Sequence, residues 1–185
     1  MNKLSVLVVM VTLVFGLLLI SCDNGNSPNG VDNSFIGDGN NMANSMIVGC
    51  LKCGMDVSVA CPEDYAPDDK VLDFAASITD NEFVLTDDPK IAAEGADVIF
   101  TDVWASMGQE DEIVARQKAF RGFIVDDDLL SLANSDPMVM HCLPAHKGEE
   151  ISEEVFESHA TQIFDEAENR LHVQKAIMYL LMKDA

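Results

Sequence analysis

The chain has 185 residues, and its 32 acidic against 11 basic residues give a formal net charge of −21 at pH 7. Such an excess of negative charge repels a phosphate backbone, so the composition argues against nucleic-acid binding. The five cysteines have no regular spacing and do not indicate a disulfide scaffold. Residues 22–185 are numerous enough to bury roughly 70% of the unfolded surface in one α/β domain.

A single basic residue, Lys3, precedes an apolar run over residues 4–20, and the sequence LISC follows at 19–22. This pattern predicts a lipoprotein-type signal peptide over residues 1–21, with Cys22 as the residue that carries the lipid. The run also approaches the ~20 residues of a membrane-spanning helix, so a retained membrane leader helix is the alternative. Both readings attach the chain to a membrane.

Residues 22–34 consist largely of Asn, Gly, Ser, Asp and Pro, which predicts a flexible tether before a domain at 35–185. Only residues 34–36 then remain for a strand before the turn at Gly37. A buried strand usually has five or six residues, so we expect a truncated first strand. This expectation suggests that the leader and tether replaced other sequence.

Short apolar runs alternate with amphipathic segments through the rest of the chain. The runs predict buried strands at 55–60, 82–85, 97–101, 122–125 and 137–141. The amphipathic segments predict helices at 42–53, 68–78, 89–94, 110–120, 127–133 and 166–183. This alternation is typical of a single three-layer α/β domain, a Rossmann-like doubly wound parallel sheet with helices on both faces.

Four polar clusters follow predicted strands or enter a helix, where open α/β sheets place their ligands. The first is GDGNN at 37–41, a turn that opens a helix and offers N–H groups and the Asn41 amide to an anion. Met42 stands where a dinucleotide fingerprint has its third glycine, which argues against that fingerprint. A purely structural turn is the alternative.

The second cluster is DVWASMGQE at 102–110, in which Asp102 closes a predicted strand. A carboxylate at this place can hold an ammonium group, although a turn or helix-capping Asp is the alternative. That alternative leaves the apolar Trp104 and Met107 unexplained, because loops that carry large apolar residues usually cover something.

The third cluster, HCLPAH at 141–146, places the thiol of Cys142 just after a strand. A zinc site from His141, Cys142 and His146 lacks the second ligand pair that such sites have, and an inert buried cysteine is the alternative. Cys50 and Cys53 form a CxxC pair on an apolar helix face, which favours a place in the core.

The fourth cluster, FDEAENR at 164–170, enters the last predicted helix. A cation in a first turn opposes the helix dipole by about 0.3–1 kcal/mol, so Arg170 requires an anionic or carbonyl partner. A surface pair with Asp165 or Glu166 would also satisfy it.

Four segments, GDGNN, DVWASMGQE, HCLPAHKGEEIS and FDEAENRLHVQKA, occur in an order and spacing that resemble the ornithine carbamoyltransferases. The resemblance covers residues 35–182. The DxxxSMG loop at 102–108 is the mark of the ornithine family, as opposed to relatives that act on aspartate or putrescine. The resemblance implies transfer of a carbamoyl group from carbamoyl phosphate to ornithine, in arginine biosynthesis or ornithine and citrulline metabolism.

The resemblance also implies substrate contacts. Asn41 and the backbone of Met107 would bind the α-carboxylate of L-ornithine, while Asp102 and Ser106 would bind its α-amino group. An amino acid is then fixed by both of its charges.

At the reacting end, Cys142 and the carbonyl of Leu143 would lie beside the δ-amine, and Arg170 would polarise the carbamoyl oxygen. The resemblance therefore implies Cys142, Asp102 and Arg170 as catalytic residues, with no metal and no organic cofactor. The chemistry requires a neutral amine and stabilisation of a developing oxyanion.

Members of the family also carry an amino-terminal domain with an STRT-type phosphate motif and an HPxQ carbamoyl motif, and neither motif occurs in this sequence. We therefore expect binding of carbamoyl phosphate only with a separate amino-terminal domain, and we expect the chain alone to be inactive. Part of the apolar face of the last helix would lack its usual cover. A homo-oligomer is compatible with the sequence.

Three functions remain open at this stage: part of a transferase, a lipid-anchored module that binds an amino acid, or a non-functional product of gene fusion or truncation. The location depends on the leader. A processed leader gives a membrane-anchored lipoprotein, whereas an unused leader leaves the domain in the cytoplasm, as is usual for the family.

Overall fold

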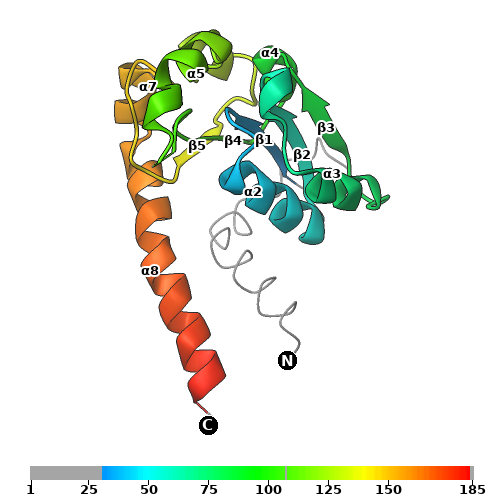
Figure 1. The fold of residues 1–185 in the computed structure, drawn as a ribbon. Coiled ribbons are helices and arrows are strands. Elements are labelled where there is room, and N and C mark those ends of the chain that lie inside the picture. Colours follow the sequence, from blue (N-terminus) through cyan, green and yellow to red (C-terminus); the bar gives the residue numbers. More distant parts are fainter. Residues whose placement is uncertain (1–30, 107, 184–185) are drawn as a thin grey trace.

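The structure, a computed structural model, describes residues 31–106 and 108–183 and is built around one five-stranded parallel sheet (Figure 1). The strand order is β3-β2-β1-β4-β5. The strands are β1 Asp32–Ile36, β2 Asp56–Ala60, β3 Phe83–Thr86, β4 Val98–Thr101 and β5 Met138–His141. The chain winds outward from β1 to β3 and then from β4 to β5, so the predicted doubly wound Rossmann-like sheet is confirmed.

Helices cover both faces of the sheet (Figure 1). On one face lie α2 Asn41–Lys52 and α3 Asp69–Ala76. On the other face lie α4 Pro89–Ala93, α5 Ile113–Ala119, α6 Asp127–Leu130 and α7 Glu153–Ser158. The last helix, α8 Ala160–Met182, packs its first half beside β5 and then runs past the body of the domain.

The strands contribute side chains to two hydrophobic cores, because successive side chains point to opposite faces of the sheet. Phe35 and Phe100 belong to the core under α2 and α3, whereas Ile36 and Ile99 belong to the core under α4 to α7. Full burial of one such side chain contributes about 1.5–3 kcal/mol. The sheet is therefore the middle layer of three, and its carboxyl ends are held rigidly.

β1 begins at Asp32, earlier than the predicted domain start at residue 35, so residues 32–34 of the expected tether are part of the sheet. Asn33 is buried, and its amide donates to the carbonyls of Val31 at 3.1 Å and Asp56 at 3.2 Å. The N–H of Asp32 donates to Asp97 at 3.1 Å. These polar side chains bind the starts of neighbouring strands, and β1 has five residues rather than three.

The predicted strand at 122–125 is wrong. This segment joins no strand of the sheet, and its contact is an isolated bridge between Val125 and Ile151. Val125 is fully buried, but it packs beneath a loop instead of in the sheet: its N–H donates to the Glu150 carbonyl at 2.9 Å. Apolar residues of segment 122–125 are thus buried without forming a strand of the sheet.

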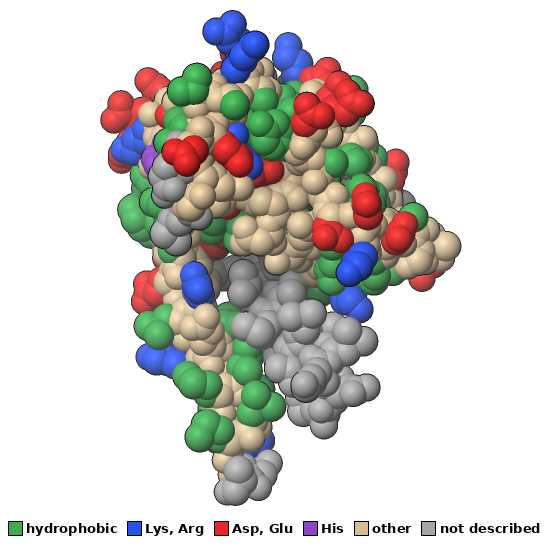
Figure 2. Space-filling model, in the orientation of Figure 1, with side chains coloured by type: hydrophobic (Ala, Val, Ile, Leu, Met, Phe, Trp, Pro, Cys, Tyr) green, Lys and Arg blue, Asp and Glu red, His purple; other side chains and the backbone are tan. Residues whose placement is uncertain are grey.

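The carboxy-terminal helices also differ from the prediction. Helix α7 was not predicted, and Ser152 begins it by accepting a hydrogen bond from the Val155 N–H at 3.1 Å. Helix α8 begins at Ala160, before the predicted start at 166. From Leu171 onward it exposes several large apolar side chains, namely Leu171, Met178, Tyr179, Leu180, Leu181 and Met182. Figure 2 shows hydrophobic side chains along the free end of this helix.

The predicted signal peptide or leader at 1–21, the lipidation residue Cys22 and the tether up to residue 30 lie outside the described residues. Within 31–106 and 108–183, none of the helices combines the length and apolar character needed to cross a bilayer.

Candidate active site

A cavity of about 540 Å³ lies at the carboxyl ends of β4 and β5, between the start of α2 and the middle of α8. Its lining includes most of the residues predicted for the site: Asn41, Asp102, Ser106, Cys142, Leu143 and Arg170. Met107, the remaining predicted contact, lies outside the described residues. Four segments far apart in the sequence therefore meet at one cavity, because parallel strands end at the same edge of a sheet.

The GDGNN turn places the start of α2 at this cavity. Asn40 caps the helix, since its side-chain oxygen accepts a hydrogen bond from the Met42 N–H at 3.0 Å. Asn41 is then the first helical residue, and its exposed side chain lines the cavity. A helix N-terminus attracts anions through its free N–H groups and its dipole, so this wall suits a carboxylate.

Gly39 allows the turn to approach the loop after β2. Its N–H donates to the Tyr65 carbonyl at 2.9 Å. A β carbon at Gly39 would lie 2.4 Å from both that carbonyl oxygen and the Pro67 nitrogen, a distance at which backbone must move. The turn therefore needs glycine here to keep its position against that loop.

Asp102 and Cys142 are joined across the strand ends. The Cys142 thiol donates to Asp102 Oδ1 at 3.0 Å, and the same oxygen accepts from the Val103 N–H at 2.8 Å. Burial raises the pKa of the Cys142 thiol above its usual range, and the negative charge of Asp102 raises it further. Cys142 is thus a neutral hydrogen-bond donor at pH 7 and not a thiolate nucleophile.

Below this pair lies the buried carboxyl of Glu166, which the sequence did not single out as a site residue. Burial raises the pKa of Glu166 to about 7, although a hydrogen bond to the backbone of His141 opposes the shift. Its Oε2 atom has no hydrogen-bond partner within the described chain. The carboxyl of Glu166 therefore titrates near neutral pH, close to Asp102.

His141 and Glu150 fix the loop that carries Leu143. The Leu143 N–H donates to His141 Nδ1 at 2.9 Å, so the ring proton is on Nε2, which faces Glu150 Oε1 at 3.0 Å. The same carboxylate oxygen accepts from the His146 N–H at 2.6 Å. Leu143 has a φ of 57°, a left-handed conformation that non-glycine residues seldom adopt outside functional sites.

Arg170 approaches the cavity from α8. Within residues 31–106 and 108–183 it makes no ion pair, so the expected alternative of a surface pair with Asp165 or Glu166 does not occur. Its exposed guanidinium group can therefore bind an oxygen atom of a ligand.

Trp104 closes another side of the cavity. It is buried and stacks on Phe120 with ring centroids 5.6 Å apart. Next to it, the Ser106 N–H donates to the Gln109 side chain at 2.9 Å, which shapes the loop that follows. Trp104 thus covers one side of the cavity, as the sequence predicted.

Among the residues that the structure describes, two groups have metal-ligand atoms within 4.8 Å of one another: Asp102 with His141 and Cys142, and His146 with Glu149 and Glu150. The zinc set considered from the sequence is not brought together, because His146 belongs to the second group. In the first group, the Cys142 thiol and both ring nitrogens of His141 already take part in hydrogen bonds. The geometry therefore suits a hydrogen-bond network.

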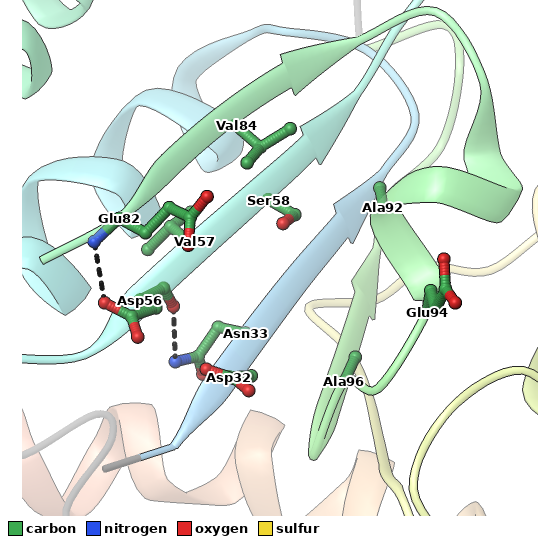
Figure 3. A pocket seen from close by; sticks show the side chains of 10 residues that line it. All are labelled: Asp32, Asn33, Asp56, Val57, Ser58, Glu82, Val84, Ala92, Glu94 and Ala96. Carbon is green, nitrogen blue, oxygen red and sulfur yellow. Dashed lines mark hydrogen bonds between the residues drawn. The ribbon is translucent and has the colours of Figure 1, made fainter. Parts of the chain in front are cut away.

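A second hollow, of about 330 Å³, lies at the opposite, amino ends of the strands (Figure 3). Its lining is acidic: Asp32, Asp56, Glu82 and Glu94 lie beside Asn33 and several apolar residues. Burial raises the pKa of Asp32 to about 6, and the charges of Asp56 and Asp97 add to the shift. No motif of the sequence pointed to this end of the sheet.

A doubly wound parallel sheet with a cavity at its carboxyl edge is a Rossmann-like α/β domain, an architecture that usually places its ligands at this edge. Residues 29–181 match the family model described as aspartate/ornithine carbamoyltransferase, Asp/Orn binding domain. The chain therefore belongs to the aspartate/ornithine carbamoyltransferase family, and the matched part is the Asp/Orn-binding domain.

The relatives include an ornithine carbamoyltransferase from Geobacter metallireducens, 53% identical over 154 residues that make up 83% of this chain and 51% of the relative. The anabolic ornithine carbamoyltransferase of Campylobacter jejuni superposes with a TM-score of 0.84 at 37% identity, covering 96% of this chain and 59% of the other. The Pyrococcus furiosus enzyme gives 0.81 at 44% identity, covering 95% and 56%. The chain spans about half the length of the curated relatives it matches.

Proposed function

We propose that this chain binds L-ornithine in the 540 Å³ cavity and supplies the ornithine-binding half of a carbamoyltransferase. The observation that carries the proposal is the meeting of Asn41, Asp102, Ser106 and Arg170 around one cavity in a member of this family. Two oppositely charged walls, the start of α2 and the Asp102 carboxylate, suit the two charges of an amino acid.

In this proposal the α-carboxylate lies against Asn41 and the N-terminus of α2, and the α-amino group lies against Asp102 and Ser106. The side chain of ornithine then extends toward Cys142 and the carbonyl of Leu143. A charge-assisted hydrogen bond at each end of the substrate fixes its orientation as well as its affinity.

For the reaction, the neutral δ-amine attacks the carbonyl carbon of carbamoyl phosphate. A carbon–nitrogen bond forms, the bond to the phosphate oxygen breaks, and the amine proton leaves with the phosphate or a water molecule. The Cys142 thiol stays neutral and orients Asp102, while Arg170 stabilises the developing oxyanion. The proposed step uses no metal or organic cofactor.

Carbamoyl phosphate is the second proposed partner, held by an amino-terminal domain of the kind that the family resemblance implies. The free end of α8, with exposed Leu171, Met178 and Leu181, is a suitable surface for that domain, since large exposed apolar patches usually mark interfaces. A homo-oligomer is compatible with the same surface.

Calorimetry with ornithine tests the binding proposal. We expect a Kd on the order of 1 mM, about −4 kcal/mol, because half of the surroundings of the substrate is contributed elsewhere. Putrescine is the matched control, because it carries amines but has no α-carboxylate to bind Asn41 and the start of α2. Absence of heat with ornithine, on a chain with a cooperative unfolding transition, would contradict the proposal.

We propose separately that Cys22 carries a lipid and anchors the domain to a membrane, on the basis of the apolar run at 4–20 and the LISC sequence. This would make the chain a lipid-anchored amino-acid-binding module if no partner domain joins it. Metabolic labelling with a fatty acid should mark the native chain and not Cys22→Ala. Labelling that survives this substitution would contradict Cys22 as the lipidated residue, and a native chain that takes up no label would support the cytoplasmic alternative.

A further inference from the structure

Arg116 on α5 is buried, although it is charged, and it joins two loops of the site. One nitrogen, Nη1, donates to Asp38 Oδ2 at 2.6 Å and to the Trp104 carbonyl at 2.7 Å. The Nε–H donates to Glu112 Oε2 at 2.9 Å. Asp38 belongs to the turn at 37–41 and Trp104 to the loop at 102–109, so a single guanidinium group holds both segments.

The contact with the first segment is reinforced through Tyr65. The Arg116 guanidinium lies 4.9 Å from the centre of the Tyr65 ring. The carbonyl of Tyr65 accepts the Gly39 N–H, and Gly39 cannot carry a side chain without displacing that loop. Arg116 thus contacts the turn at 37–41 directly through Asp38 and indirectly through the loop on which the turn rests.

We propose that Arg116 is a positioning residue that sets the distance between the turn at 37–41 and the loop at 102–109, and thereby the affinity for the zwitterionic end of an amino acid. The inference rests on the proposed ornithine site, because these segments carry Asn41 on one side and Asp102 and Ser106 on the other. A ligand that is bound by both of its charges needs these groups at one fixed separation.

Electrostatics gives Arg116 a second effect at the same place. Burial raises the pKa of Asp38, and the guanidinium group of Arg116 opposes this shift. In this ion pair, Arg116 Nη1 lies 2.6 Å from Asp38 Oδ2, so the guanidinium group neutralises the carboxylate charge. Without the arginine, an ionised Asp38 near the start of α2 would repel the α-carboxylate that Asn41 is proposed to bind.

Lysine cannot replace this arginine. The planar guanidinium group presents donors in a fixed fork, and here it reaches Asp38, the Trp104 carbonyl and Glu112 at once. An ammonium group keeps the positive charge but cannot span these three acceptors. Arg116→Lys therefore separates the positioning effect from the balance of charge.

The test uses the full chain with three variants. Arg116→Lys removes the bridge and keeps the charge, and the double variant Arg116→Gln with Asp38→Asn avoids an unpaired buried acid that would endanger folding. Glu112→Gln is the matched control, because it removes the negative charge of the exposed carboxylate that Arg116 Nε contacts and leaves both loop contacts. Thermal unfolding confirms that each variant is folded.

Two readouts follow. Trp104 is the only tryptophan of the chain, so its fluorescence reports on the loop at 102–109 without a ligand. We expect acrylamide to quench it more strongly in Arg116→Lys and in the double variant than in Glu112→Gln. We also expect at least tenfold weaker ornithine binding by calorimetry in those two variants and no change in the control.

The outcomes separate the two proposals. A folded Arg116→Lys or double variant that keeps both native quenching and an ornithine Kd within twofold of the native chain would overturn the positioning role. If the native chain itself binds no ornithine, the proposed function fails, and the quenching comparison then decides whether Arg116 positions the loop. Equal quenching in all variants would overturn it in that case as well.

Discussion

Buried acids are handled differently at the two ends of the sheet. At the carboxyl end, Asp102 accepts hydrogen bonds from the Cys142 thiol and a backbone N–H, and Asp38 is paired with Arg116. At the amino end, Asp32 lies among other acids, and their charges together with burial raise its pKa to about 6. No Lys or Arg lines that hollow in the part of the chain that the structure describes.

The two sets of acids have different roles. Asp56 and Asp97 at the amino end accept hydrogen bonds from the backbone at the start of neighbouring strands, at 2.7 Å from Glu82 and 3.1 Å from Asp32. These carboxylates join the starts of neighbouring strands, although their negative charges repel one another. Asp102 at the carboxyl end borders an open cavity. Substitutions at each end test whether the two sets of acids differ in this way.

The largest effect concerns turnover at the carboxyl end. We expect the lone chain to form no measurable citrulline from ornithine and carbamoyl phosphate, because holding two substrates together supplies roughly 7–11 kcal/mol of the barrier reduction. Addition of a separately expressed carbamoyl-phosphate domain should restore activity. Robust turnover by the lone chain that is lost in Cys142→Ala would show that this expectation is wrong.

Glu166 should give the next largest effect. A carboxyl whose pKa is raised from 4.5 to about 7 in the folded state stabilises the fold below about pH 4.5 and loses that contribution as the pH rises to 7. The shift corresponds to about 3 kcal/mol. Urea unfolding at pH 5 and pH 8 should show a smaller loss in Glu166→Gln than in the native chain, and equal losses would contradict it.

Asp102→Asn should weaken ornithine binding by about 1.5–3 kcal/mol, the usual contribution of a hydrogen bond to a charged group. The amide still accepts from the Val103 N–H, so the free energy of unfolding should change little. Calorimetry of this variant beside Asp32→Asn, which lies at the other end, should show the loss of affinity in Asp102→Asn alone. An equal loss in both variants would break the contrast between the ends.

The smallest expected effect is at Asp32. Its pKa is raised from 3.8 to about 6, so it stabilises the fold below about pH 4 and loses that contribution as the pH approaches 6. Solvent screening of this partly exposed group limits the effect to about 1 kcal/mol. At pH 8, Asp32→Asn should therefore unfold at a higher urea concentration than the native chain, while the exposed control Asp73→Asn should not.

Much of this arrangement could be predicted from the sequence. Alternation of apolar runs with helical patterns gave the doubly wound sheet. The residues Asn41, Asp102, Cys142 and Arg170 were predicted to converge because each follows a strand or enters a helix at the same edge, and the structure places them around one cavity. The roles assigned to them remain predictions.

The errors have physical causes. Periodicity and composition report burial, but they do not report what a segment packs against, so 122–125 looked like a strand and Asp32 and Asn33 looked like a tether. Arg116 lies in a strongly charged stretch, and no local pattern separates a buried arginine from its exposed neighbours. Glu166 acquires its role from burial between α8 and β5, which is a property of tertiary contact.

The central place of β1 has a consequence for synthesis of the chain. Asn33 pairs with Val57 on one side and Val98 on the other, so the middle strand is complete only after β4 has been made. Ribosomes add about 5–20 residues per second, and parallel pairs that are distant in sequence form slowly. The nascent chain therefore keeps one edge of β1 unpaired for several seconds, an interval in which the apolar Phe35 and Ile36 and the free backbone of this edge would be open to a chaperone.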